Sequence, residues 1–109
     1  MKQIEPKDLK SLIDAGGVCL IDVRQPEEHD LVRIEGSTLI PLDELDTRTE
    51  EVRVLIESEK NVVLYCRSGK RSAIAMAWLE AHGVKGNVRN LRGGINAYAK
   101  EVDPRLEPY

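Results

Sequence analysis

The chain contains few of the residues that bind metals or form disulfides. It has two cysteines, Cys19 and Cys66, and two histidines, His29 and His82. The cysteines lie far apart, with no Cys-x-x-Cys pair and no histidine spacing typical of zinc ligands. We therefore expect no structural metal and no cofactor.

Long apolar runs and an excess of positive charge are also missing. No segment approaches the ~20 apolar residues that a membrane-spanning helix requires, and residues 1–6 lack the apolar core of a signal peptide. The formal net charge is -3 at pH 7, whereas general nucleic-acid binding usually requires a basic surface. We expect a cytoplasmic protein in a reducing compartment that binds neither membranes nor nucleic acids.

The length and the order of segments favour one α/β domain over residues 1–109. Charged residues make up 32% of the chain and apolar residues 41%, which is enough to build a core. Strand-like apolar runs alternate with helix-like segments, and no repeat or linker interrupts them. Such alternation predicts a parallel sheet with right-handed crossovers and helices on both faces.

The element boundaries follow from apolar periodicity and from turn residues. Strands are expected at 18–23, 38–40, 62–66 and 88–91. Helices are expected at 6–15, from 49 to a turn at Asn61, at 72–82 and at 94–100, with a short turn or helix at 26–29 and one helical turn at 42–45. Thr49 and Ser72 are interpreted as helix caps, and Ile74 and Trp78 as the packing side of the helix over 72–82. The prolines Pro104 and Pro108 indicate an extended tail.

One segment joins an expected buried strand to a basic loop and then to a helix. The apolar run over 62–65 predicts a strand buried on both faces, which places Cys66 at its carboxyl end, where open α/β sheets bind ligands. The loop that follows consists of Arg67, Ser68, Gly69, Lys70 and Arg71. A glycine among cations allows backbone N–H groups to turn inward and form an anion-binding nest.

This setting predicts a thiolate at Cys66. Cysteines at helix N-termini or near basic residues have pKa values lowered from ~8.5 to roughly 3.5–7.5, so they are ionised at neutral pH. The unpartnered N–H groups and the dipole of the following helix act in the same direction. Cys66 is therefore a candidate nucleophile that needs no general base. The alternative for Cys66 is a buried cysteine with a structural role only. We give that interpretation to Cys19, which lies inside an apolar strand.

Several motifs resemble the rhodanese-like sulfurtransferases in order and spacing. They are Asp22-Val23-Arg24, Ile34-Glu35-Gly36-Ser37 with Ile40-Pro41, the run from Cys66 to Ser72, and Leu91-Arg92-Gly93-Gly94 with Ala97-Tyr98. The resemblance extends over nearly the whole chain and implies a three-layer sandwich with a central parallel sheet of about five strands. The nearest similarity is to the rhodanese domain at the carboxyl end of adenylyltransferase/sulfurtransferase proteins.

The resemblance implies an activity and a role for each residue of the loop. Cys66 matches the nucleophile, which would take a sulfane sulfur from thiosulfate or another persulfide donor and pass it to cyanide, a thiol or a small sulfur-carrier protein. The five residues that follow match the family's active-site loop: Arg67, Ser68, Gly69, Lys70 and Arg71. Their N–H groups would hold the persulfide, and their cations would attract an anionic donor. Asp22 and Arg24 match a motif that is chiefly structural.

Two other functions are weighed against sulfur transfer. Related phosphatases place five residues between cysteine and arginine, whereas four separate Cys66 from Arg71, and Ser72 stands where the phosphatase arginine would fall. The smaller ring of N–H groups suits one sulfur better than a tetrahedral oxyanion, which disfavours a phosphatase or arsenate reductase. The second alternative is a persulfide carrier or interaction module that receives sulfur from a partner enzyme.

The remaining polar and glycine motifs are interpreted as structural. His82, just before Gly83, is typical of a helix C-terminus, where a partly charged imidazole is favourable. Gly93 and Gly94 indicate a turn or a site of tight packing ahead of the last helix. His29 lies in an acidic turn and is assigned no role.

Overall fold

The computed structural model describes residues 2–106, and within them five parallel strands form one sheet. In chain order the strands are β1 (Gln3–Ile4), β2 (Cys19–Asp22), β3 (Thr38–Leu39), β4 (Val62–Tyr65) and β5 (Val88–Leu91). Their order across the sheet is β1-β5-β4-β2-β3, and every neighbouring pair is parallel. The predicted parallel α/β sheet is confirmed. Strand β1 was not predicted, because Gln3 and Ile4 are not part of an apolar run.

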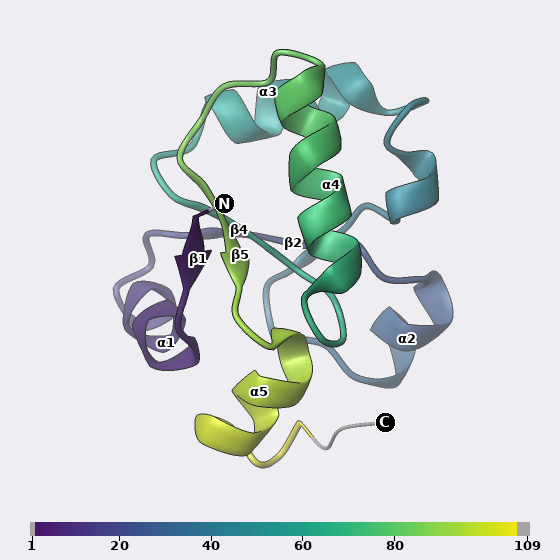
Figure 1. Ribbon diagram of the computed structural model, residues 1–109. Coiled ribbons are helices and arrows are strands. Elements are labelled where there is room, and N and C mark those ends of the chain that lie inside the picture. The colour runs from purple at the N-terminus through teal and green to yellow at the C-terminus, as the bar shows by residue number, and fades with distance from the viewer. Residues whose placement is uncertain (1, 107–109) are drawn as a thin grey trace.

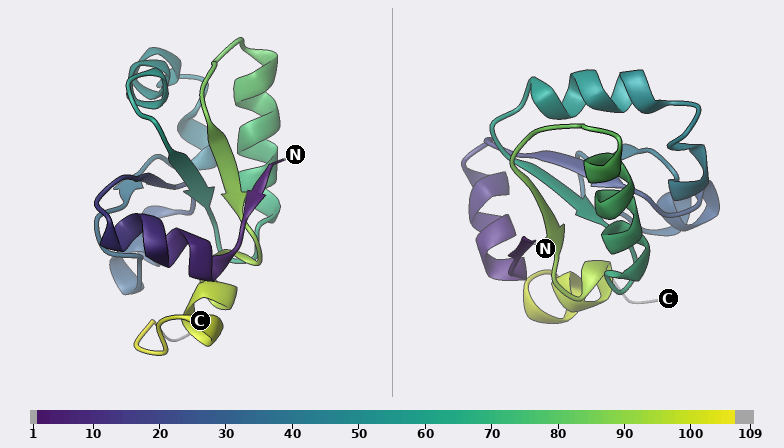
Figure 2. Two further views of the ribbon diagram at one scale, coloured as in Figure 1. Left: turned by 90° about the vertical axis from the view of Figure 1, so that its left-hand side faces the viewer. Right: turned by 45° about the horizontal axis from the view of Figure 1, so that its top comes forward.

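Helices cover both faces of the sheet, as expected. They are α1 (Pro6–Asp14), α2 (Pro26–Leu31), α3 (Thr49–Glu57), α4 (Lys70–Ala81) and α5 (Gly94–Glu101), with a 3-10 turn, η1, at Leu42–Glu44. In the right-hand view of Figure 2 the strands pass between α3 at the top and α5 at the bottom. Among residues 2–106, every helix is too short or too polar to cross a bilayer.

Strand β4 lies at the centre of the sheet and contributes to the core on both faces. Its four side chains are at most 1% exposed. Val62 and Leu64 belong to one buried cluster with residues of α3 and α4, whereas Val63 and Tyr65 belong to a second cluster with residues of α1 and α5. Successive strand residues point to opposite faces. Cys66 therefore follows Leu64 onto the α4 face, where it joins the first cluster.

The starts of two helices differ from the sequence prediction. Helix α4 begins at Lys70, two residues earlier than expected, because Gly69 adopts a left-handed conformation (φ 104°) and serves as its N-cap. Ser72 is therefore inside the helix, and its predicted role as a cap is wrong. Thr49 is not a cap either, since its hydroxyl donates backward to Leu45 O at 2.9 Å.

The packing side of α4 also differs from the prediction. Ile74 is 58% exposed, so its assignment to the buried side is wrong, whereas Trp78 packs against the core as expected. The buried residues of the helix are Ser72, Ala75 and Leu79. Two of these three side chains are small, so the hydrophobic pattern alone did not reveal which side of α4 faces the sheet.

The segment after α5 folds back rather than extending away. Leu106 N–H donates to Asp103 O at 3.0 Å, and the Leu106 side chain packs against the cluster that contains Tyr98. The prediction of an extended tail is therefore wrong over 102–106, and Pro108 lies outside the described residues.

A buried ion pair anchors the carboxyl end of β2. Asp22 and Arg24 are both fully buried and joined by hydrogen bonds of 2.9 and 2.7 Å, and Arg24 Nη2 also donates to Val32 O at 2.6 Å. His29 Nδ1 lies 2.9 Å from Asp22 Oδ2, so a histidine that was assigned no role joins this network. These contacts tie β2 to α2 and are consistent with the structural role that the resemblance implied.

Candidate active site

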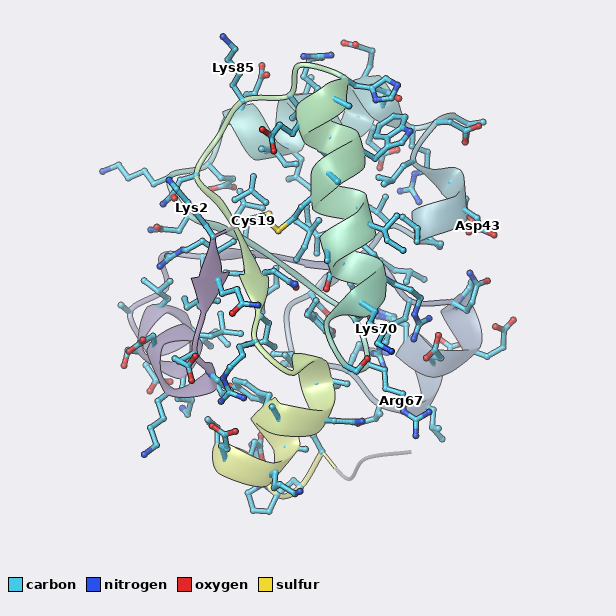
Figure 3. All side chains as sticks on the ribbon, viewed as in Figure 1. Lys2, Cys19, Asp43, Arg67, Lys70 and Lys85 are labelled. Carbon is cyan, nitrogen blue, oxygen red and sulfur yellow. The ribbon has the colours of Figure 1, made fainter. Side chains whose placement is uncertain are left out.

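The candidate site is the short connection between β4 and α4, which lies above α5 in Figure 1. Together with the first two residues of α4 it contains every site residue predicted from the sequence: Cys66, Arg67, Ser68 and Gly69 in the connection, and Lys70 and Arg71 in the helix. Cys66 is buried, with 1% of its surface exposed. Arg67, Ser68 and Lys70 are exposed, and Figure 3 shows Arg67 and Lys70 at the base of α4.

The Cys66 sulfur accepts hydrogen bonds from the backbone of the loop. Gly69 N–H donates to Cys66 Sγ at an N···S distance of 3.0 Å. Burial acts to raise the pKa of the Cys66 thiol, but hydrogen bonds from the Ser72 hydroxyl and from the N–H groups of Ser72, Gly69 and Ser68 outweigh it and hold the pKa below its usual value. The direction agrees with the sequence prediction, although hydrogen bonds rather than nearby cations are the main cause.

The first turn of α5 binds the opposite side of the loop. Ile95 N–H donates to Cys66 O at 2.9 Å, and Asn96 N–H donates to Arg67 O at 3.1 Å. N–H groups at a helix N-terminus have no partners within the helix and are available for such bonds. A side chain on Gly94 would place its Cβ 2.5 Å from Cys66 O, so this close approach requires glycine. The predicted tight packing at the glycine pair is confirmed.

Two polar residues that the sequence analysis did not place in the site also belong to it. Ser72 Oγ lies 3.4 Å from Cys66 Sγ and donates to Asn90 Oδ1 at 2.5 Å. Asn90, on β5, is 2% exposed, and its Nδ2 donates to Gly69 O at 3.1 Å. The sequence does show that Asn90 is a polar residue within an expected strand. It does not show which residues the Asn90 side chain would contact.

The cations of the loop have different surroundings. Arg71 forms a bidentate ion pair with Glu28 of α2, with N···O distances of 2.6 and 2.9 Å. Its charge is therefore balanced by a carboxylate, and the pair links α2 to α4. The exposed cations are Arg67 and Lys70.

Both histidines contact residues outside the Cys66 loop. His82 is the C-cap of α4, as predicted; its Nδ1 lies 2.8 Å from Trp78 O, and its ring stacks on Trp78. His29 contacts Asp22, as described above. Among residues 2–106, no group of three or more His, Cys, Asp or Glu side chains could hold a metal ion.

Comparison with known proteins agrees with this geometry. The family model described as the rhodanese-like domain matches residues 5–101. The chain is 37% identical over 109 residues to a sulfurtransferase of Allochromatium vinosum, covering 99% of this chain and 97% of the relative. It is 38% identical over 107 residues to the probable adenylyltransferase/sulfurtransferase MoeZ of Mycobacterium tuberculosis. That match covers 97% of this chain but 26% of MoeZ, so the chain spans about a quarter of that relative's length.

Solved structures of rhodanese-related proteins share the fold. The crystal structure of a rhodanese-related protein from Thermoplasma volcanium superimposes with a TM-score of 0.77 at 31% identity, covering 94% of each chain. Family model, sequence and fold agree, and the chain belongs to the rhodanese-like domain family.

Proposed function

We propose that this protein is a sulfurtransferase that carries a sulfane sulfur on Cys66. The observation that carries the proposal is the set of donors around the sulfur, with Gly69 N–H at 3.0 Å and a thiol pKa held below its usual value. Such donors stabilise a thiolate before transfer and the terminal sulfur anion of a persulfide after it.

The proposed chemistry is a double displacement. The Cys66 thiolate attacks the outer sulfur of thiosulfate, the S–S bond of the donor breaks, and sulfite leaves with the bonding electron pair. An acceptor thiolate or cyanide then attacks the terminal sulfur of the Cys66 persulfide, the Sγ–S bond breaks, and the Cys66 thiolate is regenerated. A persulfide donor reacts in the same way, with a thiolate as the leaving group. Neither step consumes an external oxidant or reductant.

The exposed cations determine which donors approach. Because Cys66 is 1% exposed, a donor must reach Sγ across the surface that carries Arg67 and Lys70. Positive charge at an entrance accelerates the association of anions more than that of neutral molecules. We expect Arg67→Ala to lower kcat/KM for thiosulfate more than for an uncharged organic trisulfide. Equal losses for the two donors would show that charge attraction is not the role of Arg67.

The central test is the mass of the intact protein after exposure to thiosulfate. Wild type should gain one sulfur that cyanide removes, and Cys66→Ser should gain none. Cys19→Ser is the matched control, since Cys19 is the other free thiol and burial raises its pKa. The control should gain sulfur like wild type. Unmodified wild-type protein, or the same added mass on folded Cys66→Ser, would contradict the proposal.

The acceptor is proposed from the relatives. MoeZ carries both adenylyltransferase and sulfurtransferase in its name, and its match to this chain supports a small sulfur-carrier protein as acceptor. A thiol acceptor is the simpler case. Slow turnover with thiosulfate together with rapid labelling of Cys66 by a cysteine desulfurase would favour a persulfide carrier that serves a partner enzyme. Rapid turnover with thiosulfate would favour an enzyme that acts on small molecules.

A further inference from the structure

We propose that Asn90 is a positioning residue that holds both Ser72 and Gly69 in the orientations from which they donate hydrogen bonds to the Cys66 sulfur. The proposal deepens the proposed function at the same site, and it rests on that function for its consequence in sulfur transfer.

The sheet places Asn90 beside the loop. Strand β5 pairs with β4 so that Asn90 lies opposite Leu64, two residues before Cys66. Leu64 points to the α4 face of the sheet, and the Asn90 side chain reaches the first turn of α4 on that face. With 2% of its surface exposed, Asn90 is one of the few buried polar residues of the described chain. Burying an amide is costly unless it forms hydrogen bonds, so its contacts are informative.

The hydrogen bonds determine the orientation of the Asn90 amide. Gly69 O is a carbonyl oxygen and can only accept, so the atom 3.1 Å from it must be the NH₂ group of Asn90. The amide oxygen then faces Ser72 Oγ at 2.5 Å. The reverse orientation would place two acceptors against each other at Gly69. One side chain thus holds a carbonyl of the loop and a hydroxyl of α4 at the same time.

Both of these groups act on the sulfur. The Gly69 N–H group that donates to Cys66 Sγ is on the residue whose carbonyl Asn90 binds. The Ser72 hydroxyl carries a single hydrogen and lies within reach of two acceptors, Asn90 Oδ1 and Cys66 Sγ. When Cys66 is a thiol, the hydrogen points to Asn90, and Ser72 Oγ can accept the S–H hydrogen. When Cys66 ionises, the same hydrogen lies between two acceptors and is shared by Asn90 Oδ1 and the charged sulfur, so Asn90 keeps the hydroxyl beside Sγ.

Without Asn90, Ser72 has another partner available. Serine inside a helix commonly donates to the carbonyl four residues earlier, which here belongs to Ser68. That rotation would direct the hydroxyl toward its own helix and away from Cys66. The loss of the amide would also remove one of the two hydrogen bonds to the Gly69 carbonyl at the turn into α4, the other being from Ala73 N–H at 3.2 Å. Asn90 therefore favours the thiolate through position alone, without contributing charge or a proton of its own.

The test is a pH titration of the Cys66 thiolate by its ultraviolet absorbance, in a Cys19→Ser background so that one thiol titrates. Asn90→Ala should raise the titration midpoint by about one pH unit, the order expected for a lost hydrogen bond to a charged group. Ser72→Ala should raise it similarly, and the double variant should raise it by less than the sum because Asn90 acts partly through Ser72. Asn87→Ala is the control: Asn87 lies just before β5 with an exposed side chain, and its replacement should leave the midpoint unchanged.

The pH dependence separates positioning from damage to the fold. The rate of persulfide formation by Asn90→Ala should fall roughly tenfold at pH values below the midpoint and recover above it, since only the thiolate fraction has changed. If Asn90→Ala does not fold, Asn90→Ser tests the same point, because a serine cannot span from Gly69 O to Ser72 Oγ. A folded variant with an unchanged or lowered midpoint would overturn the proposal. The titration is independent of persulfide formation, so either proposal can fail without the other.

Discussion

The glycine at position 94 allows a quantitative test of how α5 supports the active-site loop. In Gly94→Ala, the residue must remain at φ 64°, which costs an L-residue roughly 1–2 kcal/mol. Its Cβ would lie 2.5 Å from Cys66 O, so α5 must move away from the loop. That movement weakens the bonds from Ile95 and Asn96 to the loop carbonyls, each worth about 1 kcal/mol. We expect a total loss of about 3–4 kcal/mol of unfolding free energy.

The assay is urea unfolding, with Gly83→Ala as the matched control. Gly83 has nearly the same conformation (φ 73°), but a Cβ there would meet nothing within 4 Å. The control should therefore lose only the conformational part, roughly 1–2 kcal/mol. The difference between the two variants, about 2 kcal/mol, measures the close approach of α5 to the loop. Gly94→Ala alone should also raise the titration midpoint of the Cys66 thiolate. Equal losses of stability in both variants would refute the reasoning.

Two further predictions concern charge and pH. Glu28→Gln removes the carboxylate beside Arg71 and should raise kcat/KM for thiosulfate but not for an uncharged trisulfide. Because the ion pair is partly exposed, the unfolding free energy should fall by less than about 1 kcal/mol. An equal change for both donors would contradict this role of Glu28. Burial raises the pKa of Tyr65 to about 12, so the unfolded chain loses the phenol proton first, and stability should fall as the pH rises from about 10 to 12. In Tyr65→Phe this fall of stability with pH should be smaller. At neutral pH the variant should lose about 1–3 kcal/mol of unfolding free energy, because it lacks the oxygen that accepts Ile34 N–H at 3.2 Å. Urea unfolding at several pH values would check both effects, and an equally large fall in the variant would contradict the assignment to Tyr65.

Much of the fold was predictable because its signals are local. The apolar run before Cys66 predicted a strand buried on both faces, and the residues of β4 are buried as expected. The bounds of β5 agree with the prediction. Errors occurred where the local pattern was ambiguous. Helix α4 carries apolar side chains on several sides, so Ile74 was placed in the core, and the left-handed Gly69 moved the helix start ahead of Ser72.

The site shows the same division between local and distant information. Cys66 and the loop after it are contiguous, so the sequence by itself determined which residues form the loop, the family resemblance and the direction of the thiol pKa. Only the tertiary structure decided what surrounds them. Asn90 is 18 positions from Ser72, and Glu28 is 43 positions from Arg71. These contacts exist because β5 lies beside β4 and because α2 packs near the start of α4, and neither the order of strands nor the approach of helices can be read from the spacing of residues along a chain.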